Sequence, residues 1–150
     1  MTDRTQANAK RILLVEDSPG ECELFGLAWA EQERGNIVQF EHGAESARNF
    51  LQRSTTPLPH LILLDLKLRN FDGLTLLRQI RADARLTAIP VIIFTSSDDQ
   101  QDITASYAAG ANGYVVKPST FADLVSLARD ISHFWLAWNR LPRQEPTPAC

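Results

Sequence analysis

The sequence has few cysteines, no long apolar run and no apolar N-terminal segment, which are features of disulfide-rich, membrane-spanning and secreted proteins. It contains only two cysteines, Cys22 and Cys150, which make neither a disulfide framework nor a thiolate metal site. No apolar run approaches the roughly 18 residues that a membrane-spanning helix needs. The polar segment 1–10 lacks the apolar centre of a secretory signal. We therefore expect a reduced, cytoplasmic protein.

Positive charge is also scarce. Fifteen lysines and arginines stand against 18 aspartates and glutamates, which gives a formal net charge of -3. Nucleic-acid-binding domains and membrane-surface helices carry dense basic faces. We expect neither a nucleic acid nor a membrane as a partner.

The hydrophobic pattern predicts the fold class. Short apolar runs alternate with longer amphipathic stretches, which is typical of a parallel sheet covered by helices. The expected strands are Ile12–Val15, Ile37–Phe40, Leu61–Leu64, Val91–Phe94 and Tyr114–Val116. The expected helices are 20–34, 44–53, 73–83, 99–109 and an extended last helix, 120–139. Five such units predict an α/β, doubly wound, flavodoxin-like sheet of strand order 2-1-3-4-5.

Single residues mark where these elements begin and end. The first, third and fourth runs are almost wholly apolar and are expected to be buried on both faces, whereas the mixed second run is expected near an edge.

Gly35 and Gly110 are placed to end helices. Asp72 can cap the third helix, and Ser119 or Thr120 the fifth.

The domain organisation follows from these limits. Residues 11–140 form one domain, and 1–10 and the proline-containing 141–150 are expected to be tails. We expect no second domain attached to it.

Chemically active side chains follow four of the expected strands. Glu16 and Asp17 follow the first strand, Asp65 the third, Thr95 the fourth and Lys117 the fifth. Because parallel strands end at one edge of a sheet, these groups are expected to converge there.

This set of groups suits phosphoryl transfer. Clustered carboxylates repel one another unless a cation is present, and hard oxygen ligands suit Mg²⁺. A carboxylate can attack a phosphoryl group and form an acyl phosphate. A metal ion, a lysine and a hydroxyl would supply the positioning and the charge that such a transfer needs.

The same segments resemble the signature of response-regulator receiver domains, which are CheY-like. They are Leu13–Asp17, Leu63–Asp65, Phe94–Ser96 and Lys117–Pro118, and Thr95 and Lys117 follow Asp65 by 30 and 52 positions. The resemblance covers residues 11–139.

The resemblance implies a role for each residue. Asp65 would accept a phosphoryl group from a sensor histidine kinase, and Lys117 would bind that group. Glu16, Asp17, Asp65 and the backbone carbonyl of Lys67 would hold Mg²⁺. Thr95 would be the switch hydroxyl, and Tyr114 the aromatic residue that turns inward with it, although a tyrosine at a strand start is also compatible with simple edge packing.

A narrower resemblance is to the small single-domain regulators paired with cyanobacterial and bacterial phytochromes. It is carried by Val15–Gly20, Thr95–Ser97, Ile131–Leu136 and Leu141–Pro142. That subgroup also serves other kinases. It usually has asparagine where this chain has Lys67 and proline where it has Arg69. Lys67 is therefore expected to alter the lifetime of the phosphorylated state, unless its side chain points into solvent.

The last helix has more apolar surface than one sheet can cover. Its apolar residues span an arc of roughly 220°, against a stripe nearer 100° for packing on a sheet. We expect a homodimer interface that includes Phe134, Trp135, Leu136 and Trp138. The alternative is that the C-terminal tail folds back over this surface.

Other functions remain open. A degenerate receiver could act only as a docking module, although the complete acidic set, Thr95 and Lys117 argue against it. An aspartyl-nucleophile phosphatase of the haloacid-dehalogenase type would need a second acid where Lys67 stands. The first turn lacks a glycine-rich cofactor fingerprint. We expect a switch that is not an enzyme.

Solvated or packing roles are expected for Cys22 and the histidines, His42, His60 and His133.

Overall fold

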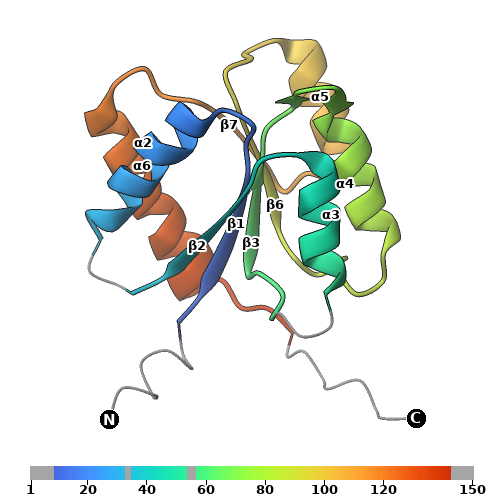
Figure 1. Cartoon of the computed structure of the whole chain (residues 1–150), viewed down its shortest axis with the longest axis horizontal. Coiled ribbons are helices and arrows are strands. Elements are labelled where there is room, and N and C mark those ends of the chain that lie inside the picture. The colour runs from blue at the N-terminus through green and yellow to red at the C-terminus, as the bar shows by residue number, and fades with distance from the viewer. Residues whose placement is uncertain (1–8, 33–34, 54–56, 143–150) are drawn as a thin grey trace.

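The computed structural model describes residues 9–32, 35–53 and 57–142 (Figure 1). Its main feature is a parallel five-stranded sheet of order β2-β1-β3-β6-β7, which confirms the predicted order. The strands are β1 (Arg11–Val15), β2 (Ile37–Glu41), β3 (Leu61–Leu64), β6 (Val91–Thr95) and β7 (Gly113–Val116). Most of both predicted tails lies outside the described residues.

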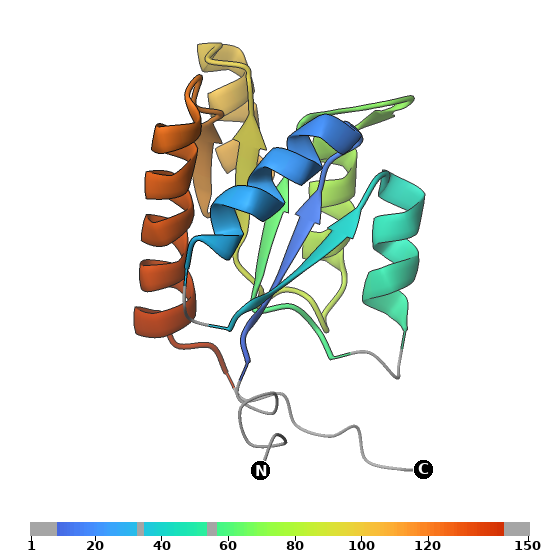
Figure 2. The ribbon, with the colours of Figure 1, turned by 60° about the vertical axis from the view of Figure 1, so that its left-hand side comes forward.

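Helices cover both faces of the sheet (Figures 1 and 2). On one face α2 (Pro19–Ala30) packs against α6 (Phe121–Ile131). The other face carries α3 (Ala44–Gln52), α4 (Gly73–Ala82) and α5 (Gln100–Ala108). The sheet is therefore doubly wound, as predicted. Across the described ranges, no helix has the length and apolar character that crossing a bilayer requires.

The core lies in two layers separated by the sheet. Along β1, Ile12 and Leu14 pack into the layer under α2 and α6, whereas Leu13 and Val15 pack into the other. This alternation follows from the two-residue period of a strand. β1, β3 and β6 are buried along nearly their whole length, and β2 is a partly exposed edge, as predicted. A rigid apolar sheet therefore fixes where the polar strand ends lie.

The helix ends agree only in part with the predictions. α2 stops at Ala30, four residues before the predicted end, because the Glu31 N–H closes the last turn on the Ala28 carbonyl. Gly35, with φ of 67°, therefore lies beyond the helix end. Gly110, with φ of 106°, does follow the C-cap residue of α5, Ala109.

The predicted caps are in place. The Asp72 side chain accepts a hydrogen bond from the Leu74 N–H at the start of α4. Of the two candidates for the last helix, Thr120 is the cap, since its hydroxyl accepts from the Asp123 N–H.

The extended last helix changes its geometry after Ile131. Residues Ser132–Trp138 form a π-helix, η1, whose wider turns shift the side chains relative to an α-helix. Leu136 is turned into the core and is only 5% exposed, so it cannot belong to the predicted dimer surface. Trp135 is partly buried against the same core. Phe134 and Trp138 stay exposed, Trp138 at 70%.

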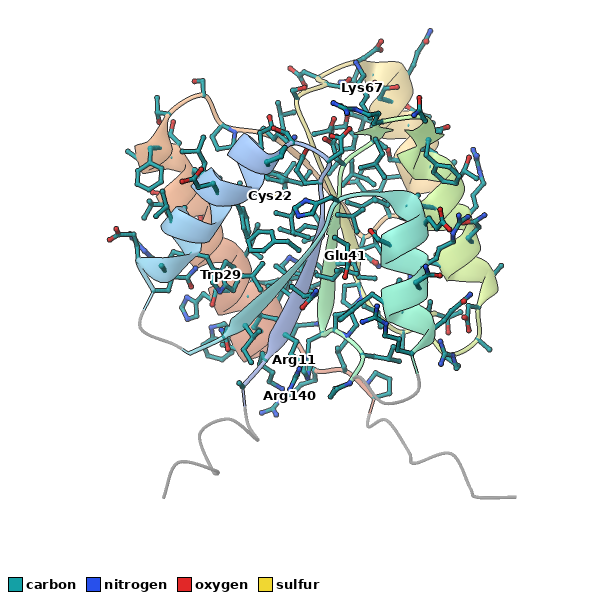
Figure 3. All side chains as sticks on the ribbon, viewed as in Figure 1. Arg11, Cys22, Trp29, Glu41, Lys67 and Arg140 are labelled. Atoms are coloured by element: carbon teal, nitrogen blue, oxygen red, sulfur yellow. The ribbon has the colours of Figure 1, made fainter. Side chains whose placement is uncertain are left out.

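A short hairpin that the sequence did not predict follows β3. It pairs β4 (Lys67–Leu68) with β5 (Phe71–Asp72), antiparallel. Asn70 in its turn has φ of 60°, a left-handed conformation that asparagine tolerates. Lys67 lies beyond the carboxyl ends of the strands, at the opposite end of the molecule from Arg11 (Figure 3).

Candidate functional site

The site lies where β1, β3, β6 and β7 end, at the upper edge of the sheet in Figure 2. Glu16 and Asp65 directly follow neighbouring strands, and the Asp65 N–H donates to the Val15 carbonyl at 3.1 Å. The Lys117 N–H donates to the Thr95 carbonyl at 2.7 Å. The hydrogen-bond ladder of the sheet thus continues one residue past the strands and positions Glu16, Asp65 and Lys117 close together.

The Lys117 ammonium group is the centre of the site. Its Nζ lies 2.6 Å from Glu16 Oε2, 2.6 Å from Glu21 Oε2 and 3.0 Å from Asp65 Oδ2. An ammonium group has three N–H donors, so each carboxylate can take one. The Lys117 side chain is mostly buried, and Nζ lies 5.7 Å from the centre of the Phe94 ring.

The carboxylates outnumber the lysine. Burial raises the pKa of Glu16 to about 8, and the adjacent Asp65 carboxylate adds to this, while the bond from Lys117 opposes it. Burial by itself would lower the pKa of Lys117, but its bonds to Glu16 and Glu21 raise it above the ordinary lysine value. The buried pocket therefore has too little positive charge for all its carboxylates.

The donor set fits a hard cation. Carboxylate oxygens of Glu16, Glu21 and Asp65 all lie within 4.8 Å of one another. Oxygen-only sites with several carboxylates suit Mg²⁺ and similar ions. A divalent ion would also supply the missing positive charge. The site can therefore hold a metal beside Asp65.

The predicted ligands are not all grouped together. Asp17 lies outside this group, and its Oδ2 accepts a hydrogen bond from the Arg69 N–H at 2.7 Å. Lys67 borders the site through its backbone N–H, which donates to Asp65 Oδ1 at 3.3 Å. Asp17 therefore links the acidic edge to the turn of the β4–β5 hairpin.

Glu21 is a site residue that the sequence reasoning missed. Ser18 and Glu21 have the spacing of a capping box, in which the glutamate would bond the Ser18 N–H. Here that N–H donates to Glu16 Oε1 at 3.1 Å, and only the reciprocal bond, from the Glu21 N–H to Ser18 Oγ, is present. The Glu21 carboxylate is therefore free to reach Lys117. The capping-box spacing by itself does not predict that Glu21 contacts Lys117.

Thr95 and Tyr114 contact a common residue, Ser97. Thr95 is fully buried, and its hydroxyl accepts from the Ser97 N–H at 3.4 Å. The half-buried Tyr114 donates its phenol hydroxyl to the Ser97 carbonyl at 2.9 Å. A displacement of Thr95 can therefore reach Tyr114 through the loop after β6.

Cys22 and two of the histidines make polar contacts near strand ends. Cys22 is buried, its thiol donates to the Glu16 carbonyl, and burial raises its pKa to about 11. Such a thiol is unreactive at neutral pH. The exposed His42 lies beside the same carbonyl. His60 is half-buried instead of solvated, and its Nδ1 accepts from the Arg11 N–H.

Comparison with known proteins identifies one family. The model of the response regulator receiver domain matches residues 12–129. The probable methanogenesis regulatory protein FilR2 of Methanothrix harundinacea is 34% identical over 134 residues, 87% of this chain and 86% of FilR2. The response regulator Rcp1 of Synechocystis is 34% identical over 137 residues, 89% of this chain and 93% of Rcp1.

Solved structures agree with the sequence matches. The phosphorylated cyanobacterial phytochrome response regulator RcpA superposes with a TM-score of 0.83 at 32% identity, covering 90% of this chain and 99% of RcpA. The Mn²⁺-bound form of Rcp1 superposes with a TM-score of 0.80, covering 89% of this chain and 99% of Rcp1.

Proposed function

Because this chain belongs to the response-regulator receiver family, we propose that Asp65 accepts a phosphoryl group from a sensor histidine kinase. The observation that carries this proposal is the contact of the buried Asp65 carboxylate with Lys117 Nζ, at 3.0 Å. An ammonium group so placed can neutralise the charge of an incoming phosphoryl group.

An Asp65 carboxylate oxygen attacks the phosphorus of the kinase's phosphohistidine, an acyl phosphate bond forms and the P–N bond breaks. The leaving imidazole takes up a proton from water. One N–H of Lys117 donates to a phosphoryl oxygen in place of one of its three carboxylate partners, and the buried Thr95 hydroxyl donates to a second oxygen.

Mg²⁺ is the cofactor that we propose. Glu16, Asp17, Asp65 and the backbone carbonyl of Lys67 would hold it, and its positive charge would offset the carboxylates and the phosphoryl oxygens. The raised pKa of Glu16 supports a cation at this place. The Mn²⁺-bound form of Rcp1 supports a divalent ion in a relative.

The output that we propose is a change in protein contacts. When Thr95 moves toward the phosphoryl group, its bond to Ser97 is disturbed, and Ser97 also holds Tyr114. Such a local change can bias a two-state surface. The chain would act as a cytoplasmic switch and homodimer, with no nucleic-acid or membrane partner and no separate metabolite as substrate.

We further propose that the kinase is a phytochrome. The similarity to RcpA, described as a cyanobacterial phytochrome regulator, and to the bacteriophytochrome regulator RtBRR, at 37% identity, supports this. The identity to FilR2, 34%, lies between the identities to these two regulators, which makes other kinases the alternative.

One experiment tests the acceptor. The protein is incubated with acetyl phosphate and Mg²⁺, and intact mass is measured for the wild type and for Asp65→Asn. We expect a gain of about 80 Da, one phosphoryl group, that disappears in Asp65→Asn and when EDTA removes the metal. An unchanged wild-type mass would refute the proposal and favour a docking module. Turnover of generic phosphate esters would instead favour a phosphatase.

A further inference from the structure

Glu21 holds Lys117 from the solvent side of the site. It lies in the first turn of α2, and its Oε2 is as close to Lys117 Nζ as that of Glu16, at 2.6 Å. The two other partners of the lysine, Glu16 and Asp65, are buried, whereas the Glu21 side chain is 46% exposed. Glu21 is therefore the partner that can leave without exposing a buried charge.

The start of α2 fixes Glu21 in this place. Pro19 begins the helix, and Ser18 caps it through the bond from the Glu21 N–H to Ser18 Oγ. Because the Ser18 N–H is satisfied by Glu16, the Glu21 carboxylate has no capping role. Its close polar contact is with Lys117, 96 positions away in the sequence.

This contact competes with a phosphoryl group. All three N–H donors of Lys117 face carboxylates, so a phosphoryl oxygen can bind the lysine only by replacing one of them. Carboxylate oxygens of Glu21 and Asp65 also lie within 4.8 Å of each other. The negative charge of Glu21 therefore opposes an anion on Asp65 and favours a cation beside it.

From these contacts we propose that Glu21 is a positioning residue that restrains Lys117 in the unphosphorylated state. Its negative charge raises the affinity of the site for the metal ion and lowers its affinity for the phosphoryl group. This inference rests on the proposed function, since it requires that the site binds both ligands. It predicts effects of opposite sign on the two ligands when Glu21 loses its charge.

The test uses Glu21→Gln and two probes. Mg²⁺ binding is measured by calorimetry, and binding of the phosphoryl analogue beryllofluoride is measured at saturating Mg²⁺. We expect Glu21→Gln to bind beryllofluoride about two- to fivefold more tightly and Mg²⁺ more weakly by a similar factor, the range for a partly exposed ion pair. The control is Glu23→Gln, which removes the same charge from an exposed position of the same helix and is expected to change neither affinity.

The outcomes separate the two proposals. Weaker binding of both ligands in Glu21→Gln indicates general damage and overturns the inference, as do unchanged affinities. Failure of the wild-type protein to bind beryllofluoride, or equal binding by Asp65→Asn, overturns the proposed function itself.

Discussion

Lys67 lies two residues after the acceptor in the chain and contacts it through the backbone. Its backbone N–H donates to Asp65 Oδ1, and its side chain is exposed. An ammonium group there can pair with a phosphoryl group and hinder an attacking water molecule. We predict that Lys67→Asn shortens the lifetime of phosphorylated Asp65 about two- to fivefold, as expected for loss of an exposed ion pair.

Loss of the phosphoryl group over time, followed by intact mass, measures this effect. Arg78→Asn removes one positive charge from an exposed position on α4 and is the matched control. Equal decay of wild type and Lys67→Asn would mean that the Lys67 side chain stays in solvent.

His60 provides a residue whose protonation opposes folding. Burial, together with the nearby positive charge of Lys10, lowers the pKa of His60 below 6.5. Below pH 6.5 the unfolded chain therefore binds a proton at His60 more readily than the folded chain does. The free energy of unfolding falls as the pH is lowered from 6.5 through the pKa of His60 in the folded state. His60→Asn keeps an acceptor for the Arg11 N–H but does not titrate.

Urea unfolding at about pH 7.5 and about pH 5.5, on either side of the ordinary histidine pKa, measures this contribution. We expect the wild type to lose more stability between these pH values than His60→Asn does. An equal loss in both proteins would contradict the assignment.

At the scale of elements, Gly73 sets how closely α4 approaches the acceptor loop. A Cβ atom at Gly73 would lie 2.2 Å from the Asp65 carbonyl oxygen and 2.8 Å from Leu66 Cα, both backbone atoms. We predict that Gly73→Ala lowers the free energy of unfolding by at least about 2 kcal/mol, because the helix must move away.

Gly20 is the matched control for that substitution. A Cβ atom there would meet nothing closer than Ser18 Oγ at 4.0 Å. Gly20→Ala should therefore raise the free energy of unfolding by about 0.4–1 kcal/mol, because alanine restricts the unfolded chain. Chemical denaturation of both variants measures the contrast, and equal stabilities would show that α4 adjusts freely.

The main elements were predictable because each has a strong local signal. Apolar runs located β1, β3 and β6, and the parallel order then brought Glu16, Asp65 and Lys117 together. The β4–β5 hairpin has only two residues in each strand, too few for a hydrophobic period. Glu21 was missed because its partner is set by tertiary structure, while its local pattern indicates only a cap.

At the scale of the whole molecule, Trp138 tests the proposed homodimer. With Phe134 it forms the exposed part of the predicted surface, now without Leu136. We predict that Trp138→Ala weakens dimerisation about tenfold or more, as loss of a central aromatic residue does, and leaves far-UV circular dichroism unchanged. Leu27→Ala, at an exposed apolar position on α2, should leave the dimer intact.

Sedimentation velocity over a range of concentrations measures the dimer. A wild-type protein that stays monomeric throughout, or a dimer equally stable in Trp138→Ala, would contradict this surface. A dimer lost in Leu27→Ala but kept in Trp138→Ala would place the interface on α2.

The π-helix that follows α6 affects how this surface can evolve. A π-turn is equivalent to one residue inserted into an α-helix, and each inserted residue rotates all that follows by about 100°. Which side chains after Ile131 face the core, as Leu136 does, and which face outward, as Trp138 does, thus depends on residue count as well as residue type. Gain or loss of a single codon near Ser132 would turn the side chains that follow by about 100°, so a lineage could change which of them meet a partner while every residue of α6 is kept.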